Sequence, residues 1–279
     1  MSKKQIKIYL SLLLLVLSYL WWQLGDQAKY LQVNFLDVGQ GDSTLITAPS
    51  GEVILVDGGP NNKLLAQMSK FLPWWERTID YLVISHWDDD HYIGLIQVLK
   101  KYEVKKILVS YLPDISSPSY LAWQDALEQE GISPKILKAG ETWQGVNNLS
   151  WQIVAASDDK NLEDNDKSLV LRLSYGQTDF LLSGDLPTEQ EEKLLANKIN
   201  LEAEVLKVGH HGSKYSSSQE FLNSVEPKVC IISASADNKF GHPHPETLER
   251  LARVKCNIYE TSKLGNISIL SNGQDWWLK

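Results

Sequence analysis

Cysteine is scarce in this sequence, and the few that are present match no metal-binding motif. The 279 residues include two cysteines, Cys230 and Cys256. Both lie in strand-like apolar runs, so we predict buried free thiols. A disulfide is the alternative if the two strands are neighbours in an oxidising compartment.

Linkers and repeats are absent as well. No Pro-, Gly- or Ser-rich segment and no low-complexity tract divides the chain. A chain of this length with 43% hydrophobic residues can bury a sizeable core. We therefore predict one folded domain over residues 30–279, preceded by a distinct segment, residues 1–29.

Basic residues are in deficit. The chain carries a net charge of −8, and residues 1–29 hold four lysines and one aspartate, so residues 30–279 carry −11. This is the wrong sign for a protein that grips nucleic acid through a broad basic surface. Tight, processive binding of DNA is disfavoured, whereas a small local contact at a metal site is still allowed.

Long uncharged runs are missing except at the N-terminus. Residues 6–24 contain no charge after Lys7, and ~20 such residues cross a bilayer as a helix. With Trp21 and Trp22 suited to the membrane interface, we predict a single-pass anchor through residues 6–24. The following domain would lie on the extracytoplasmic side of the cell membrane. A cleaved signal peptide is the alternative, although Gly25–Ala28 is a poor cleavage site.

Helical and strand-like patterns alternate along residues 30–279, with hairpins among them. This mixture favours an α/β fold in which helices cover sheets. We expect helices at 61–72, 92–102, 119–130, 187–198, 217–225 and 245–253. We expect strands at 31–38, 43–48, 52–56, 80–85, 106–110, 149–155, 168–175, 178–183, 204–208 and 228–233, followed by three short ones.

Histidine is also rare, and its distribution is uneven. All six histidines fall in three short runs that follow strand-like segments. The first run, HWDDDH, supplies His86, Asp88, Asp90 and His91, and imidazole and carboxylate groups are ligands for divalent metals. A solvated acidic loop is the alternative, but it would not explain the flanking histidines.

Three further segments carry the same residue types. An apolar strand ends in Gly184 and Asp185, which can present one carboxylate, although Gly-Asp is also ordinary turn chemistry. Another strand leads into His210 and His211. The run FGHPHP holds His242 and His244 ahead of a helix, where they are expected at the rim of a site.

These runs resemble a known family. HWDDDH is similar to the His-x-(His/Asp)-x-Asp-His signature of the metallo-β-lactamase fold. FLDVGQGDS, ILVDGG, SHWDDDHYIG, SLVLRL, FLLSGD, LKVGHHGSKYSSS and FGHPHPETLERL more closely resemble the exported domain of ComEC-type DNA-uptake proteins. The matching runs keep the same order over nearly all of residues 30–270. The resemblance implies an αββα sandwich with a metal site along one edge of the two sheets.

The resemblance also implies roles. His86 and Asp88 would hold one metal, and the second would be held by Asp90, His91 and one of the pair His210 and His211. Asp185 would bridge the two metals, and Asp57 would orient the ligands. The auxiliary candidates are Asp37, Asp42, Asn165 and Ser213.

One departure from the wider fold affects the choice of metal. Proteins of the wider fold usually have a further histidine between the His-x-(His/Asp)-x-Asp-His signature and the bridging aspartate. This sequence lacks it, because no histidine occurs between His91 and His210. Asn165 or water would fill its place, and Asp88 stands where an imidazole is common. Oxygen ligands favour Mn²⁺ or Mg²⁺, and imidazole suits Zn²⁺. We therefore expect two divalent ions, Mn²⁺ in preference to Zn²⁺.

The expected chemistry is hydrolysis. No Gly-x-Ser-x-Gly elbow or reactive cysteine is evident, whereas two metals ~3.5–4 Å apart activate a water and neutralise charge at an attacked centre. His242 or Lys214 would stabilise phosphate oxygens or protonate a leaving group; a purely structural or solvent-facing role is the alternative for both.

Three functions remain open. The first is a phosphodiesterase or nuclease acting on DNA, with competence or cell-envelope proteins as partners. The second is a cell-surface hydrolase of small or cell-wall phosphodiesters, or less favourably of a lactone or β-lactam. The third is a catalytically silent scaffold, which the presence of Asp88, Asp90, His91 and Asp185 disfavours. The sequence gives no oligomeric state.

Overall fold

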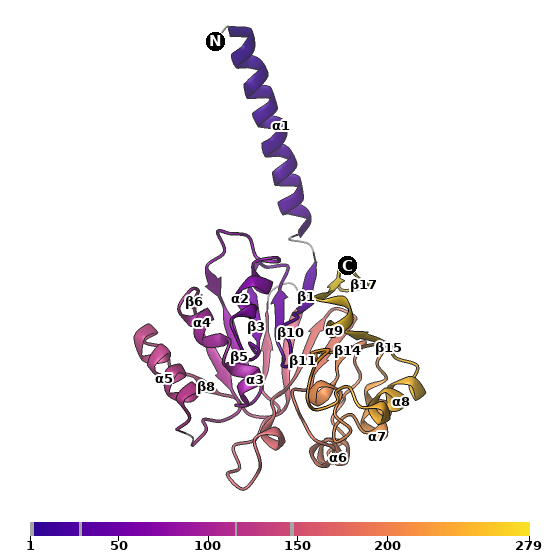
Figure 1. Cartoon of the computed structure of the whole chain (residues 1–279). Helices are drawn as coiled ribbons and strands as arrows, with labels where there is room; N and C mark the ends of the chain where they lie inside the picture. Colours follow the sequence, from indigo (N-terminus) through magenta and orange to yellow (C-terminus); the bar gives the residue numbers. More distant parts are fainter. Residues whose placement is uncertain (1–2, 28–29, 115, 146–147) are drawn as a thin grey trace.

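The computed structural model describes residues 3–27, 30–114, 116–145 and 148–279, without the side chains of Lys3 and residues 19–27. Helix α1 (Lys3–Gln27) projects away from the remainder of the chain (Figure 1). In the described part of the chain, no helix combines the length and hydropathy that crossing a membrane requires. The predicted interfacial Trp21–Trp22 pair and the segment Gly25–Ala28 lie outside the described side chains.

The first sheet has eight strands in the order β17-β16-β1-β2-β3-β5-β7-β8. Strands β3, β5, β7 and β8 run parallel, and the others pair antiparallel. The strands are β1 (Leu31–Phe35), β2 (Thr44–Thr47), β3 (Val53–Val56), β5 (Tyr81–Ile84), β7 (Ile107–Val109), β8 (Lys135–Ile136), β16 (Ile267–Ser271) and β17 (Trp276–Leu278).

The second sheet has seven strands in the order β15-β14-β13-β12-β11-β10-β9. Strands β12 to β15 run parallel, and β9 to β12 pair antiparallel. The strands are β9 (Thr142–Gln144), β10 (Leu149–Ala155), β11 (Val170–Tyr175), β12 (Thr178–Leu182), β13 (Val205–Lys207), β14 (Val229–Ile232) and β15 (Asn257–Glu260). A small parallel pair, β4 (Thr78–Ile79) with β6 (Glu103–Val104), stands apart from both sheets.

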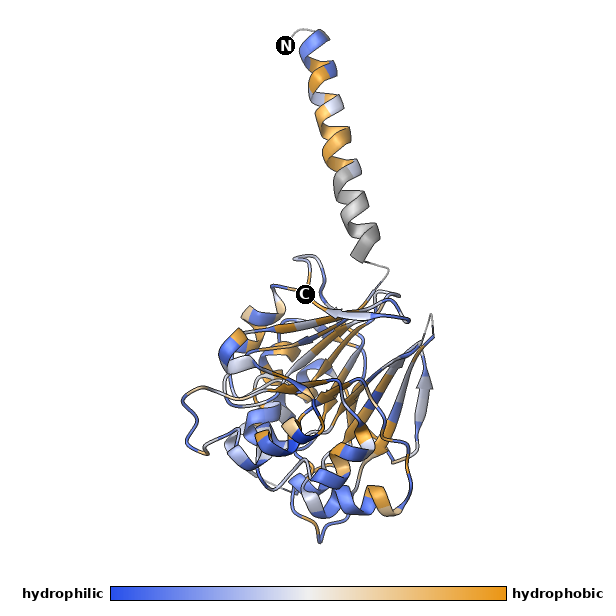
Figure 2. Ribbon diagram, turned by 90° about the vertical axis from the view of Figure 1, so that its right-hand side faces the viewer, coloured by the Kyte–Doolittle hydropathy of each residue, from blue (hydrophilic) through white to orange (hydrophobic). Residues whose placement is uncertain are grey.

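Three apolar clusters hold the layers together, because alternate residues of each strand point to opposite faces. Side chains such as Val33 and Phe180 fill the space between the two sheets. The outer face of the first sheet packs on helices α2 (Lys63–Met68), α4 (Leu95–Leu99) and α5 (Pro118–Glu130). The outer face of the second sheet packs on helices α6 (Thr188–Ala196), α7 (Gln219–Val225) and α8 (Pro245–Arg253). Figure 2 shows the strands of both sheets as mostly hydrophobic. The predicted αββα sandwich is confirmed.

The helices are short, and their bounds follow. They are α2 (Lys63–Met68), α3 (Asp89–Tyr92), α4 (Leu95–Leu99), α5 (Pro118–Glu130), α6 (Thr188–Ala196), α7 (Gln219–Val225), α8 (Pro245–Arg253) and α9 (Thr261–Leu264), with 3-10 helices η1 (Asn165–Lys167) and η2 (Gly209–Gly212).

The prediction of one continuous helix over residues 92–102 is wrong. The structure divides this region into α3 and α4, with Gly94 between them. The carbonyl groups of Asp90 and His91 accept hydrogen bonds from the backbone N–H groups of Asp42 and Gly58. These long-range bonds replace helical bonds and tie α3 to two loops of the first sheet.

The prediction of free thiols is also wrong. Cys230 and Cys256 form a disulfide, with Cα atoms 6.0 Å apart. Cys230 lies in β14, and Cys256 immediately precedes β15, which pairs with β14 in parallel. The two strands are neighbours, which is the condition under which the sequence allowed a disulfide.

Candidate metal centre

The candidate site lies where strands of both sheets end. Asp57 follows β3, His86 follows β5, Asp185 follows β12, and His211 follows β13. Since the carboxyl ends of parallel strands meet at one edge, residues distant in sequence come together there. The predicted ligand residues therefore lie at one edge of the two sheets.

Ser85 and Asp57 fix the two histidines of the HWDDDH run. Asp57 accepts hydrogen bonds from the Ser85 backbone N–H at 2.8 Å and the Ser85 hydroxyl at 2.7 Å. Nδ1 of His91 lies 2.9 Å from Asp57 Oδ2, and Nδ1 of His86 lies 3.0 Å from Ser85 Oγ. The single Ser85 proton goes to Asp57, so Ser85 Oγ accepts from His86. Each Nδ1 is therefore a donor, and each Nε2 faces the site.

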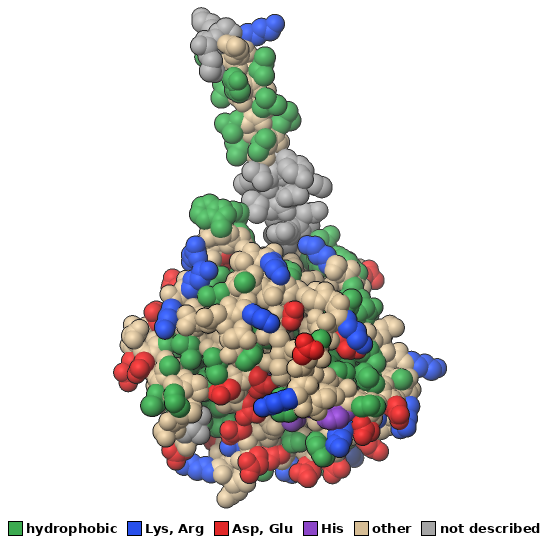
Figure 3. Space-filling model, viewed as in Figure 1, with side chains coloured by type: hydrophobic (Ala, Val, Ile, Leu, Met, Phe, Trp, Pro, Cys, Tyr) green, Lys and Arg blue, Asp and Glu red, His purple; other side chains and the backbone are tan. Residues whose placement is uncertain are grey.

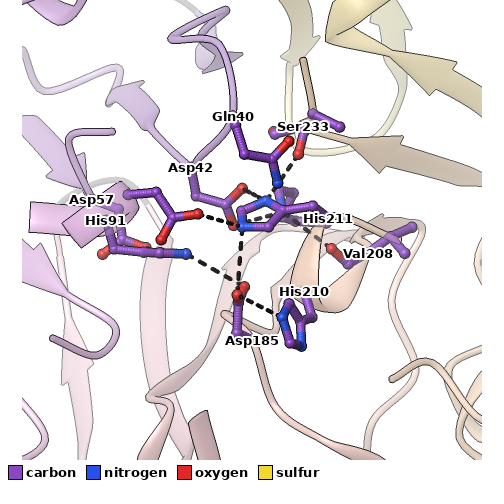
Figure 4. Close-up of polar contacts among 12 residues, drawn as sticks. Gln40, Asp42, Asp57, His91, Asp185, Val208, His210, His211 and Ser233 are labelled. Carbon is purple, nitrogen blue, oxygen red and sulfur yellow. Dashed lines mark hydrogen bonds and ion pairs between the residues drawn. The ribbon is translucent and has the colours of Figure 1, made fainter. Parts of the chain in front are cut away.

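Asp185 is the centre of the cluster. Its backbone N–H donates to Ser168 Oγ at 3.1 Å, which holds it at the end of β12. Its carboxylate oxygens lie 3.5 Å from His91 Nε2, 3.4 Å from His211 Nε2 and 4.0 Å from His86 Nε2. Figure 4 shows His91, His210 and His211 directed towards this carboxylate.

His210 and His211 occupy different positions although they are adjacent in sequence. Both adopt positive φ, 50° and 55°, which is uncommon for residues other than glycine and is a frequent feature of functional sites. His211 is buried, and its Nε2 lies 3.2 Å from Asp90 Oδ2. His210 is partly exposed, and its Nε2 lies 3.8 Å from Asp185. The geometry favours His211 over His210 as the member that faces Asp90.

A buried ion pair between Lys207 and Asp42 contacts the Nδ1 side of the His211 ring. Lys207 Nζ lies 2.6 Å from Asp42 Oδ2, and both side chains are buried. Asp42 Oδ1 lies 3.2 Å from His211 Nδ1, which also donates to the carbonyl of Ser233 at 2.9 Å. These acceptors keep the proton on Nδ1 of His211, so Nε2 faces Asp185.

The donor atoms fit a divalent metal. The buried atoms that lack a hydrogen-bond partner among the described residues include four in this cluster: Nε2 of His86, His91 and His211, and Oδ1 of Asp185. Buried polar atoms are nearly always satisfied, so four such atoms at one point fit the coordination of a cation. Two overlapping groups have ligand atoms within 4.8 Å of one another: His86, His91 and Asp185, and Asp90, His91 and His211.

The pKa values in the site also indicate that its buried carboxylates need positive charge nearby. Burial lowers the pKa of His211, but the charges of Asp185 and Asp42 outweigh this and raise it to about 10. Burial also lowers the pKa of His91, but the charges of Asp185 and Asp57 hold this pKa well above its ordinary value. Burial raises the pKa of Asp185, but the charges of His211 and His91 hold it well below its usual range. Without metal, protons on histidine supply the positive charge that these carboxylates need.

Two residues lie at the rim. Asp88 Oδ2 is 3.5 Å from His86 Nε2, and its side chain is 44% exposed. The ring of His242 is half-buried, with its centroid 5.5 Å from that of His210 and 6.1 Å from that of His211. Burial, followed by the charges of His211 and His210, lowers the pKa of His242 to about 4. His242 is therefore neutral at pH 7.

The other predicted residues have local contacts or, for Asn165, a side-chain oxygen that is unpartnered within the described residues. Lys214 is exposed, with its Nζ 5.3 Å from the centroid of Tyr215. Ser213 Oγ accepts from the N–H of Tyr215, and Asp37 Oδ1 accepts from the N–H of Gly39, so both stabilise local turns. Asn165 lies in η1, where its buried Oδ1 lacks a hydrogen-bond partner among the described residues.

Sequence reasoning missed Lys207 and Ser85 as members of the site. Lys207 ends the apolar strand β13 immediately before the histidine pair, and a lysine in a buried strand was the available signal. For Ser85 no such signal exists, because serine at a strand end is ordinary. Its role depends on Asp57, which is 28 residues earlier in the chain.

Comparisons with known proteins indicate the relatives of this chain. Residues 36–153 match the family model of the metallo-beta-lactamase superfamily. The chain is 32% identical over 259 residues to ComE operon protein 3 of Bacillus subtilis, covering 85% of this chain and 32% of that protein. It is 32% identical over 241 residues to competence protein ComA of Neisseria gonorrhoeae, covering 84% and 31%. The chain spans about a third of the length of these relatives.

Solved structures share the fold at low sequence identity. A metal-dependent hydrolase of the β-lactamase superfamily matches with a TM-score of 0.53 and 13% identity, covering 82% of this chain and 95% of the other. CmlA, a diiron β-hydroxylase from Streptomyces venezuelae, matches with a TM-score of 0.53 and 14% identity, covering 82% and 52%. At such identity these structures support the fold alone.

Proposed function

We propose that this chain, which has the metallo-β-lactamase fold of metal-dependent hydrolases and is related to ComEC-type competence proteins, is a phosphodiesterase that acts on DNA. One observation carries the proposal: three buried imidazole Nε2 atoms without partners among the described residues converge on the Asp185 carboxylate. The similarity of this chain to competence proteins supports the choice of DNA over other phosphodiesters as the proposed substrate.

Two divalent ions fit the donor set. His86 and Asp88 would hold one ion, and Asp90, His91 and His211 the other, with Asp185 shared. The oxygen-rich first site favours Mn²⁺, and Zn²⁺ is the alternative. When bound, the two ions would activate water and neutralise charge on a phosphoryl group. Asp57 and Asp42 would keep Nε2 of His91 and His211 directed at the ions.

His242 is the residue of the rim best placed to contact a phosphate. Its ring lies beside His210, and its low pKa keeps it neutral at pH 7. A neutral imidazole offers an N–H hydrogen bond to a phosphoryl oxygen and does not act as a cation. Lys214 would need a new side-chain orientation to take part, because its Nζ lies over the ring of Tyr215.

The acidic charge of residues 30–279 fits an enzyme that meets its substrate at the metal centre. Bound cations would offset the carboxylates locally, whereas the remaining surface would repel a polyanion. We therefore propose a hydrolase with weak DNA binding outside the site. Only a weak fall of activity with increasing salt would be expected, because the steepness of the salt dependence scales with the number of phosphate contacts and the centre makes few.

Membrane association through α1 is part of the proposal. Its side chains between Ile6 and Leu17 are largely apolar and exposed, and a helix that is apolar on all sides requires an apolar environment. The domain would lie on the extracytoplasmic side, near competence or cell-envelope proteins. Vesicle flotation of the full chain tests this point separately from activity.

Activity measurements decide between the candidates. The protein, stripped of metal and supplied with Mn²⁺ or Zn²⁺, should cleave single- or double-stranded DNA and bis-p-nitrophenyl phosphate. Turnover of the small diester without cleavage of DNA would replace the nuclease with a hydrolase of small or cell-wall phosphodiesters. Binding of two ions without turnover of any ester would indicate a scaffold.

A further inference from the structure

Two adjacent tryptophans project from the domain at an exposed turn. Trp74 and Trp75 are 80% and 53% exposed, and Trp74 is the most exposed large apolar side chain among those described. Their rings contact each other edge to face, with centroids 5.6 Å apart. Tryptophans without cover are unusual on a soluble surface, and clustered apolar exposure marks a contact site.

The turn is held rigidly at its base. The backbone N–H of Glu76 donates to the carbonyl of Pro73 at 2.9 Å, which leaves Trp74 and Trp75 at the two central positions. The Glu76 side chain accepts from the N–H of Thr78, and Leu72 is buried in the core before the turn. The hydrogen bonds of the turn therefore hold the two indoles at the surface of the domain.

The turn flanks the place where α1 joins the domain. Tyr30, the first residue described after α1, lines a depression of about 240 Å³ together with Pro73 and Glu76. On its other side Tyr30 contacts Trp277 of β17, with ring centroids 5.2 Å apart. We call Tyr30, Trp74, Trp75 and Trp277 the aromatic face. Figure 3 shows hydrophobic side chains projecting from the domain beside the base of α1.

The aromatic face lies opposite the metal centre. Strand β1 begins next to Tyr30 and runs towards the loop of Asp42. Strand β5 begins after the tryptophan turn and β4, and it ends at Ser85 and His86. Both strands therefore start at the aromatic face and end at the cluster. Strands of four to five residues at ~3.3 Å per residue separate the two ends by roughly 13–17 Å.

We propose that the aromatic face rests in the interfacial layer of a lipid bilayer, with the metal centre turned towards the aqueous phase. The inference rests on the proposed membrane association of α1, whose exposed apolar side chains leave the domain from this face. Tryptophan and tyrosine prefer the interface because each ring has an apolar body and a polar group. Exposed Lys70 and Arg77 on either side of the turn suit anionic headgroups.

The consequence concerns the substrate. A domain seated on this face keeps the cluster away from the bilayer and open to a polymer that arrives from solution. The orientation also fixes the height of the centre above the membrane through β1 and β5. A tether through α1 alone would leave the domain free to rotate.

Depth measurements test this orientation. The chain has no free cysteine, so Trp75→Cys in the full chain places one thiol for a spin label. Tyr215→Cys is the matched control, because Tyr215 is 66% exposed and lies on the loop after His211. In phosphatidylcholine–phosphatidylglycerol vesicles, the label at 75 should be more accessible to oxygen than to a water-soluble nickel chelate. The label at 215 should show the reverse order, and Trp74→Cys should behave like Trp75→Cys.

The outcomes separate the two proposals. Aqueous accessibility at both 74 and 75, in chains that float with the vesicles, would overturn the orientation and leave membrane association intact. Chains that do not float would overturn membrane association and this inference together. A label at 75 shielded from both reagents would assign the aromatic face to a protein contact and overturn the lipid assignment. Hydrolysis of a small phosphodiester, measured on the same labelled chains, reports on the catalytic proposal independently.

Discussion

Replacing Lys207 by methionine is the sharpest test of how the fold supports the candidate centre. Lys207 is buried, and its Nζ lies 2.6 Å from Asp42 Oδ2 and 3.1 Å from the carbonyl of Val208. Methionine keeps the length of the side chain and removes the charge. Asp42 would then be a buried carboxylate whose remaining cationic neighbours are His211, at 3.2 Å, and His91.

The expected loss of stability follows from this geometry. At an effective dielectric constant of about 20, two unit charges 2.6 Å apart attract by about 6 kcal/mol. Desolvation of both groups offsets part of this attraction. Breaking a buried pair by removing one partner costs about 3–5 kcal/mol, because the other charge is left without compensation. We expect Lys207→Met to lower the free energy of unfolding by about 3–4 kcal/mol.

Urea denaturation of the metal-free protein, followed by circular dichroism, measures this loss. The double variant Lys207→Met with Asp42→Asn should be less destabilised than the two single changes predict together, because no uncompensated charge remains. The control is Lys228→Met, since Lys228 pairs with Glu204 at 3.2 Å but is 62% exposed. That exposed pair should contribute less than about 1 kcal/mol.

Two results would refute the reasoning. A loss of under about 1 kcal/mol for Lys207→Met, similar to the control, would show that the pair does not support the fold. Strict additivity of the Asp42 and Lys207 changes would show that the two groups do not act together. The metal affinity of the variant gives a second measurement. A displaced Asp42 would no longer hold the His211 ring in place. Loss of a residue that orients a metal ligand typically lowers metal affinity about 10–100-fold.

The remaining predictions concern the cluster and the disulfide. Asp185→Ala should abolish hydrolysis and lower the metal content measured by elemental analysis; full activity with both ions would remove Asp185 as the shared ligand. His211→Ala should lose one bound ion, whereas His210→Ala should keep both, because His211 faces the carboxylates more closely; equal losses would contradict this assignment. The pKa of His211 is raised to about 10 in the metal-free protein, so its stabilisation is complete below pH 6.5 and is lost as the pH rises towards 10. Urea denaturation in EDTA should therefore show a falling free energy of unfolding from pH 7 to 10, and a flat profile would be inconsistent with protonated His211. Removing the Cys230–Cys256 disulfide, which closes 26 residues, should lower the free energy of unfolding by about 3 kcal/mol, and an unchanged urea midpoint after reduction would contradict this.

The sequence by itself determined the layers and the position of the site. Strands such as β5 and β12 are short, apolar and bounded by turn residues, so their periodicity is visible locally. Ligand-type residues directly after such strands indicate a site at the carboxyl ends, and His86, His91 and Asp185 meet there as expected. This works because a strand and the residue that follows it are adjacent in the chain.

Only the tertiary structure decided which partners each residue has. His210 and His211 are equivalent by sequence, and their backbone conformation and the approach of Asp42 and Ser233 separate them. The role of Lys207 depends on a residue 165 positions away. The disulfide required β14 and β15 to be neighbours. Sequence patterns report local periodicity, whereas burial and pairing depend on contacts between distant segments, so these features follow from the folded chain alone.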